Sequence, residues 1–218
     1  MIKIVPSIIP ENFNELKDKM DIVNDFVEVV QIDISDGEFA ESVTWPYNEG
    51  EELPGRLLPY KDFLEIEVDL FVVNPEEIAE AWVKAGAKSV VLHLETIEDP
   101  SFVMARLNLQ NAKIGLSINP SSKNEILYEW IPEADFVQFM GNDKVGFSGV
   151  KLDPNVYDKV RELRKDFPVL EIAVDIGVNF ETAPKLVKSG ATKLISGTAI
   201  FESKNIEEAI KKLGLESF

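Results

Sequence analysis

Eight short apolar runs in this chain each end at, or are followed closely by, a chemically functional side chain or a glycine. Amphipathic stretches separate most of these runs, so strands and helices are expected to alternate along the chain. Eight such repeats predict an α/β fold of the (β/α)8 type, a TIM barrel. In that fold the active site lies at the C-terminal ends of the strands, so a polar residue there is a functional candidate. The eight positions are Ser7, Asp33, Asp69, His93, Asn119, Met140, Asp175 and Gly197.

The spacing of apolar residues predicts the elements themselves. Alternation with period 2 predicts strands at 2–6, 27–33, 64–70, 88–93, 112–117, 135–139, 170–175 and 193–196. A period of 3.6 predicts helices at 11–20, 76–85, 154–165, 181–189 and 206–213. Residues 40–60 are irregular and are expected to form a long loop with a short helix. Gly86 and Gly190 are each expected to stop a helix just before a buried strand.

Composition limits the class of protein. A chain of 218 residues, 45% of them hydrophobic, can bury one sizeable core, so we expect a single barrel domain over 1–218. The net charge of −17 argues against nucleic acid and anionic membranes as partners. No apolar run approaches the roughly 20 residues that span a bilayer. The chain has no cysteine and begins without a signal-peptide core, so a cytoplasmic location is expected.

Strand alternation predicts a polar barrel interior. Glu65, Glu67 and Asp69 share one face of their strand, while the apolar residues between them are expected to pack under the helices. Burying this many polar groups is costly unless they have partners or a function, so the interior is expected to hold a site. The same parity directs inward Gln31, Asp33, Ser35, His93, Glu95, Ser117, Asn119, Ala173 and Asp175.

Short motifs follow the strand ends in a fixed order. They are Val5-Pro6-Ser7, Gln31-Ile32-Asp33-Ile34-Ser35-Asp36-Gly37, Val68-Asp69-Leu70, Val91-Leu92-His93, Asn119-Pro120, Gly146-Phe147-Ser148-Gly149, Val174-Asp175-Ile176-Gly177 and Ser196-Gly197-Thr198-Ala199. Over nearly the whole chain, this ordered set resembles the ribulose-phosphate 3-epimerase family. The resemblance implies a metal-dependent barrel of pentose phosphate metabolism that inverts C3 of ribulose 5-phosphate to give xylulose 5-phosphate. It also implies a site with two aspartates, two histidines, a divalent metal and a phosphate cradle.

The resemblance implies roles for individual residues. Asp33 and Asp175 match the two aspartates and are expected to be the catalytic pair, because epimerisation needs a base on one face of C3 and an acid on the other. The family has two glycines after the second aspartate, whereas this chain has Ile176 and then Gly177. The expected substrate-binding residues are Ser7, His93, Met140, Gly146, Gly177, Gly197 and Thr198, with the glycines and Thr198 in the phosphate cradle.

The expected metal site departs further from the family. The two family histidines align with Gln31 and Asp69, which leaves an all-oxygen ligand set of Gln31, Asp33, Asp69 and Asp175. Carboxylate and amide oxygens favour magnesium or manganese over zinc. The alternative is that the site binds no metal.

Two functional hypotheses remain open. The first is an isomerase that epimerises a ketose phosphate, and the second is a barrel that binds a phosphorylated sugar without catalysis or with altered specificity. A lyase related to orotidine-phosphate decarboxylase or hexulose-phosphate synthase would need Asp-x-Lys-x-x-Asp, but Ser35 stands in the lysine position. The partner expected in either case is a phosphorylated sugar. Trp45 and Tyr47 are candidates for a homo-oligomer contact.

Overall fold

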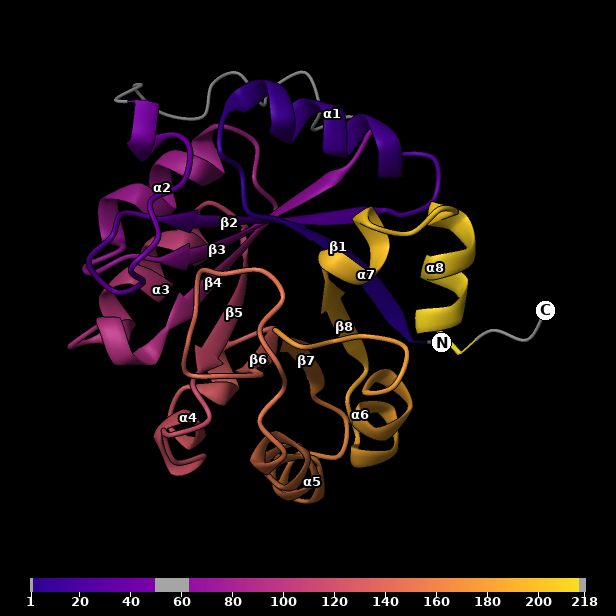
Figure 1. Cartoon of the computed structure of the whole chain (residues 1–218). Coiled ribbons are helices and arrows are strands. Elements are labelled where there is room, and N and C mark those ends of the chain that lie inside the picture. Colours follow the sequence, from indigo (N-terminus) through magenta and orange to yellow (C-terminus); the bar gives the residue numbers. More distant parts are fainter. Residues whose placement is uncertain (1, 50–62, 216–218) are drawn as a thin grey trace.

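The computed structural model describes residues 2–49 and 63–215 of the chain. Eight parallel strands close into a barrel in chain order, and β8 pairs with β1 to complete it. Helices lie outside this ring of strands (Figure 1), which confirms the (β/α)8 prediction. The strands are β1 (Lys3–Ile8), β2 (Val29–Ser35), β3 (Glu65–Phe71), β4 (Ser89–His93), β5 (Lys113–Ile118), β6 (Phe136–Met140), β7 (Glu171–Asp175) and β8 (Lys193–Ser196).

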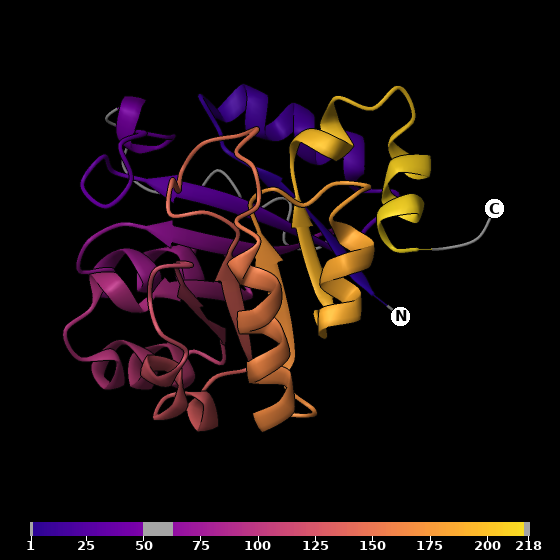
Figure 2. The same ribbon diagram turned by 60° about the horizontal axis from the view of Figure 1, so that its bottom comes forward.

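The helices form the outer layer of the barrel. The orange helices α5 and α6 lie outside the strands in Figure 2, and no helix in the described ranges is long and apolar enough to cross a membrane. The α-helices are α1 (Phe13–Val23), α2 (Glu76–Lys84), α3 (Pro100–Leu109), α4 (Glu125–Tyr128), α5 (Asn155–Asp166), α6 (Ala183–Ser189), α7 (Thr198–Phe201) and α8 (Ile206–Leu213). Short 3-10 helices are η1 (Tyr47–Glu49), η3 (Leu94–Thr96) and η4 (Ile131–Glu133).

Helix α3 was not predicted from the spacing of apolar residues. Its apolar side chains point both ways, because Val103 and Leu107 are buried whereas Phe102 and Leu109 are exposed. The helix therefore lacks the one-sided stripe on which the prediction depends. The start signal is nevertheless present, since Asp99 caps the Ser101 N–H and proline follows at the first helical position.

Glycine ends helix α6 as predicted. Gly190 has φ +116°, and its N–H donates to the carbonyls of Leu186 and Val187. A side chain at this position would also meet Arg164 at 2.7 Å. The left-handed turn that only glycine adopts freely therefore sends the chain directly into β8.

The register of the sheet brings the strand ends to one edge of the barrel. Asp33 at the end of β2 pairs with Asp69 on β3, and Met140 on β6 pairs with Asp175 on β7. A cluster of four buried apolar residues packs above these ends, and we call it the apolar cap. The apolar cap consists of Ala40, Phe71, Met140 and Val145, with Phe39 and Ile176 packed against it.

One predicted surface contact is wrong. Trp45 is only 1% exposed, and its ring packs on Trp82 with centroids 6.0 Å apart and on Phe13 with centroids 5.4 Å apart. It is part of the core between loop and helices and does not offer a subunit contact. Tyr47 is 39% exposed in η1, and the remainder of the predicted loop from residue 50 onward lies outside the described residues.

Candidate active site

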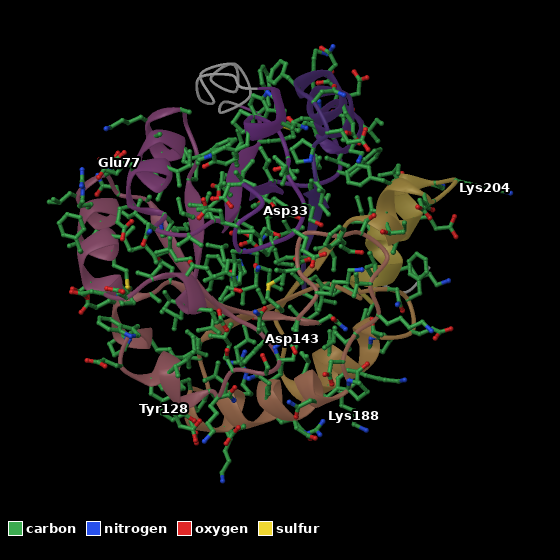
Figure 3. The ribbon with its side chains drawn as sticks, turned by 60° about the vertical axis from the view of Figure 1, so that its left-hand side comes forward. Asp33, Glu77, Tyr128, Asp143, Lys188 and Lys204 are labelled. Atoms are coloured by element: carbon green, nitrogen blue, oxygen red, sulfur yellow. The ribbon has the colours of Figure 1, made fainter. Side chains whose placement is uncertain are left out.

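A cavity of about 930 Å³ opens at the C-terminal end of the barrel, and the two predicted catalytic aspartates line it. Asp33 enters from the end of β2 and Asp175 from the end of β7. The predicted substrate-binding residues that also line this cavity are Ser7, Gly146, Gly177, Gly197 and Thr198. Figure 3 shows Asp33 inside the ring of helices, whereas Glu77, Tyr128, Lys188 and Lys204 lie at its periphery.

The two aspartates are buried, and their pKa values are raised. Asp33 is 4% exposed and Asp175 is 5% exposed, and Asp33 Oδ1 has no hydrogen-bond partner in the part of the chain that the structure describes. Burial raises the pKa of Asp33 well above its ordinary value, and repulsion from Asp175 is the second cause of this increase. The pKa of Asp175 is raised to about 7, chiefly by burial and secondly by repulsion from Asp69. The hydrogen bond from the Ile176 N–H partly opposes this increase. The pair therefore holds a proton near neutral pH and can act as acid and base together.

The loop after β2 fixes the backbone around Asp33. The Thr44 hydroxyl donates to the Asp33 carbonyl at 3.2 Å and accepts the Ser35 N–H at 2.9 Å. The Thr44 N–H donates to the Ser35 carbonyl at 3.0 Å. These bonds hold the loop against the strand end and bring Ala40 of the apolar cap over the site.

The loops after β7 and β8 form the other end of the cavity. Gly177 has φ +73°, and a side chain there would approach the Leu152 nitrogen to 2.4 Å. Ile176 has φ +68°, a left-handed conformation that is strained for a β-branched residue. The family has a glycine at this position, and Ile176 adopts the positive φ that a glycine would adopt easily. The Ile176 side chain packs against the apolar cap. The departure from the family motif is accommodated by strain, directly beside Asp175.

A hydrogen-bonded layer lies beneath the cavity, inside the barrel. The His93 Nε2 atom lies 2.7 Å from Asp69 Oδ1, and the Gln138 amide donates to Asp69 Oδ2 at 2.6 Å. The Gln31 amide donates to Gln138 Oε1 at 3.0 Å and to Glu67 Oε1 at 3.1 Å. Two of the predicted metal ligands are therefore members of a packed polar network. The residues of this hydrogen-bonded layer are Gln31, Glu67, Asp69, His93, Gln138 and Lys193.

A family model described as the Ribulose-phosphate 3 epimerase family matches residues 3–201. The chain belongs to the ribulose-phosphate 3-epimerase family. Among curated relatives, the ribulose-phosphate 3-epimerase of Bacillus subtilis is 29% identical over 222 residues and is covered to 98%, as is this chain. The Mycobacterium bovis ribulose-phosphate 3-epimerase is also 29% identical, with 96% of this chain and 90% of the relative covered.

Solved structures of other proteins share the fold. A 3-hexulose-6-phosphate synthase matches the full length of both chains with a TM-score of 0.69 at 18% identity. A mutant tryptophan synthase alpha-subunit from Pyrococcus furiosus has a TM-score of 0.72 at 15% identity, covering 98% of this chain and 99% of that one. At these identities the likeness concerns the barrel alone.

The hydrogen-bonded layer does not fit the metal that epimerases of this family use. Both carboxylate oxygens of Asp69 already accept hydrogen bonds, so Asp69 has no free oxygen for a metal. Gln31 donates through its amide nitrogen, and its Oε1 atom has no partner among the described residues. Neither position offers the imidazole that zinc or iron favours. Within residues 2–49 and 63–215, no three His, Asp or Glu side chains are arranged to hold a metal ion. The four-oxygen ligand set of Gln31, Asp33, Asp69 and Asp175 stays a prediction.

Two predicted substrate-binding residues do not line the cavity. His93 and Met140 are fully buried, His93 in the hydrogen-bonded layer and Met140 in the apolar cap. Glu95, predicted to face inward beyond β4, lies instead in η3, where it accepts the Asn119 N–H at 2.8 Å. The chain turns into the 3-10 helix at Leu94, so strand alternation no longer applies there.

Sequence analysis missed Gln138 and Lys193 as interior polar residues. Gln138 stands inside β6 and is fully buried, and Lys193 begins β8 and is almost fully buried. A lone polar residue within an apolar β-run was the available signal for Gln138. The partners of these residues could not be read from the sequence, because Gln31 and Gln138 meet only when β2 and β6 face each other across the closed barrel.

Proposed function

We propose that this protein epimerises a ketose phosphate at C3, with ribulose 5-phosphate as the first candidate substrate and Asp33 and Asp175 as the acid/base pair. The observation that carries the proposal is the placement of these two buried carboxyls on one cavity, both with raised pKa values. Membership of the epimerase family supports the reaction class. Ribulose-phosphate 3-epimerases at 27–29% identity support the choice of substrate.

The proposed reaction uses one proton held by the pair. The ionised carboxylate removes the C3 proton, and the electrons of the broken C–H bond move to form an enediolate with the adjacent carbonyl. The protonated carboxyl then delivers its proton to the opposite face of C3, the carbonyl forms again, and the two aspartates have exchanged roles. Because the reaction is reversible, each residue serves as acid in one direction and base in the other.

The proposed phosphate end of the substrate lies at the loops after β7 and β8. Barrels commonly bind phosphate there through backbone N–H groups. The net charge of −17 would repel an anionic substrate at long range, so attraction must come from such local donors. Gly177, Gly197 and Thr198 stand at this end of the cavity and are proposed to supply them.

Proton NMR of ribulose 5-phosphate incubated with the protein tests the proposal, because xylulose 5-phosphate has a distinct spectrum. The expected result is conversion by the wild type and none by the Asp33→Asn/Asp175→Asn variant. A panel of other ketose phosphates identifies an altered substrate. Saturable binding of these sugars without conversion of any would instead support the non-catalytic barrel, which the loss of both family histidines favours.

A further inference from the structure

An unbroken chain of buried polar contacts runs along the inside of the barrel through the hydrogen-bonded layer. At its lower end the Lys193 ammonium lies 2.6 Å from both carboxylate oxygens of Glu67 and 3.9 Å from the centre of the Phe136 ring. Glu67 also accepts the Gln31 amide, which connects through Gln138 to Asp69. His93 completes the chain at its upper end. All six members of the chain are buried.

The direction of each hydrogen bond in this chain is fixed by its charged members. The Glu67 carboxylate can only accept hydrogen bonds, so Gln31 must point its NH2 group towards Glu67. The same NH2 group reaches Gln138 Oε1, and this leaves the Gln138 NH2 group for Asp69. If either amide were rotated by 180°, its oxygen would face a carboxylate oxygen of Glu67 or Asp69, and the hydrogen bond would be lost. The Lys193–Glu67 pair therefore sets the orientation of groups that lie well above it.

The position of Gln138 links this chain to the missing histidines. By the sequence resemblance, Gln31 and Asp69 stand where the family has its two histidines. Gln138 bonds to both residues from across the barrel. Asp69 is then held between Gln138 and His93, with no oxygen left unbonded. The space between the two former ligand positions is occupied by an amide.

We propose that this hydrogen-bonded chain replaces the family's metal ion, with Lys193 as its fixed positive charge and Gln138 as the positioning residue that keeps Asp69 bound to His93. The chain contains two buried carboxylates, and Lys193 supplies within the protein a cation that a metal would otherwise bring. The inference concerns cation binding and the order of the layer. It holds whether or not the protein converts a sugar phosphate, so its failure is distinguishable from failure of the proposed reaction.

Zinc titration against a competing chelating dye tests the replacement. Wild type should bind zinc weakly, and Gln31→His/Asp69→His should gain little because Gln138 still fills the space between the two positions. Adding Gln138→Leu should tighten zinc binding at least about tenfold over the double variant. Stoichiometric zinc in the purified wild type would overturn the proposal, as would a double variant that binds zinc as tightly as the triple variant.

His93 provides a spectroscopic test of positioning, because it is the only histidine of the chain. In NMR spectra of the protein with labelled imidazole nitrogens, the Nε2 proton of the wild type should exchange slowly with water. Gln138→Leu should speed this exchange at least about tenfold, since Asp69 loses its second support. Ser117→Ala is the matched control, because Ser117 is also buried but its hydroxyl has no partner among the described residues. Should Gln138→Leu fail to fold, Gln138→Asn shortens the amide and serves the same purpose; exchange unchanged from wild type in the folded variant would overturn the positioning role.

Discussion

The barrel interior holds two pairs of buried acids that differ in their surroundings. Glu67 and Asp69, in the hydrogen-bonded layer, have every carboxylate oxygen bonded, Glu67 by Lys193 and Gln31 and Asp69 by His93 and Gln138. Asp33 and Asp175 face the cavity, and the Asp33 Oδ1 atom has no partner in the described ranges. The first pair stabilises the structure because each of its oxygens is bonded to a neighbouring donor, and we call it the compensated pair. The second pair remains uncompensated at neutral pH, which is the condition expected of catalytic groups.

Breaking the compensated pair should have the largest effect on stability. Lys193→Met leaves the Glu67 charge buried without its counter-ion, and such losses cost about 3–5 kcal/mol. Denaturant unfolding followed by circular dichroism measures the change. Lys193→Met combined with Glu67→Leu removes both charges and should recover most of the loss. If the single variant is as stable as wild type, Lys193 is not the counter-ion that holds this layer.

Removing the uncompensated pair should affect the reaction instead. Asp33→Asn and Asp175→Asn each preserve side-chain shape while abolishing proton transfer, so turnover should fall at least about 10²-fold. Steady-state rates with ribulose 5-phosphate provide the measurement. Asp166→Asn is a suitable control, since this exposed acid at the end of α5 accepts the hydroxyl of Tyr128, which lies at the periphery in Figure 3. A variant of either Asp33 or Asp175 with wild-type turnover would remove that residue from the proposed mechanism.

The uncompensated pair should also make the stability depend on pH. A pKa of about 7 in folded Asp175 exceeds the ordinary value of 3.8, so its contribution to stability is complete below about pH 4 and is lost as the pH rises through 7. Asp175→Asn should therefore raise the melting temperature relative to wild type, and the gain should grow between pH 5 and pH 8. One pKa unit corresponds to about 1.4 kcal/mol, so the gain should grow by roughly 2–3 kcal/mol between pH 5 and the pKa of about 7.

These melting curves should be recorded in chelator, because a bound cation would lower the pKa of Asp175 and hide the effect. A constant difference between Asp175→Asn and wild type across the range would show that Asp175 is already ionised at low pH.

The strained residue beside Asp175 gives the smallest predicted effect. At φ +68° glycine is more stable than alanine by about 1 kcal/mol. In helices and strands alanine is instead the more stable of the two residues. Ile176→Gly should therefore be more stable than Ile176→Ala. The comparison cancels the loss of the isoleucine side chain, and thermal unfolding measures it. A more stable alanine variant would mean that residue 176 does not keep a positive φ in solution.

Part of this arrangement follows from the sequence and part does not. Strand alternation correctly directed Asp33, Asp69 and Asp175 inward, because parity is a local property of each strand. It could not separate the two pairs of acids, since compensation depends on partners more than 100 residues away, such as Lys193 for Glu67. The prediction that Trp45 is exposed in a loop also failed, because its burial results from packing on Trp82.

The two-aspartate mechanism is tested most directly by following deuterium at C3 while ribulose 5-phosphate is converted in heavy water. Two separate carboxyls predict that xylulose 5-phosphate carries deuterium from its first appearance, because the acid has exchanged with solvent before it delivers its proton. Ribulose 5-phosphate recovered early should still carry its original proton. Early xylulose 5-phosphate that retains the substrate proton would mean that one group both removes and returns it, and would contradict the assignment of Asp33 and Asp175 as an acid/base pair.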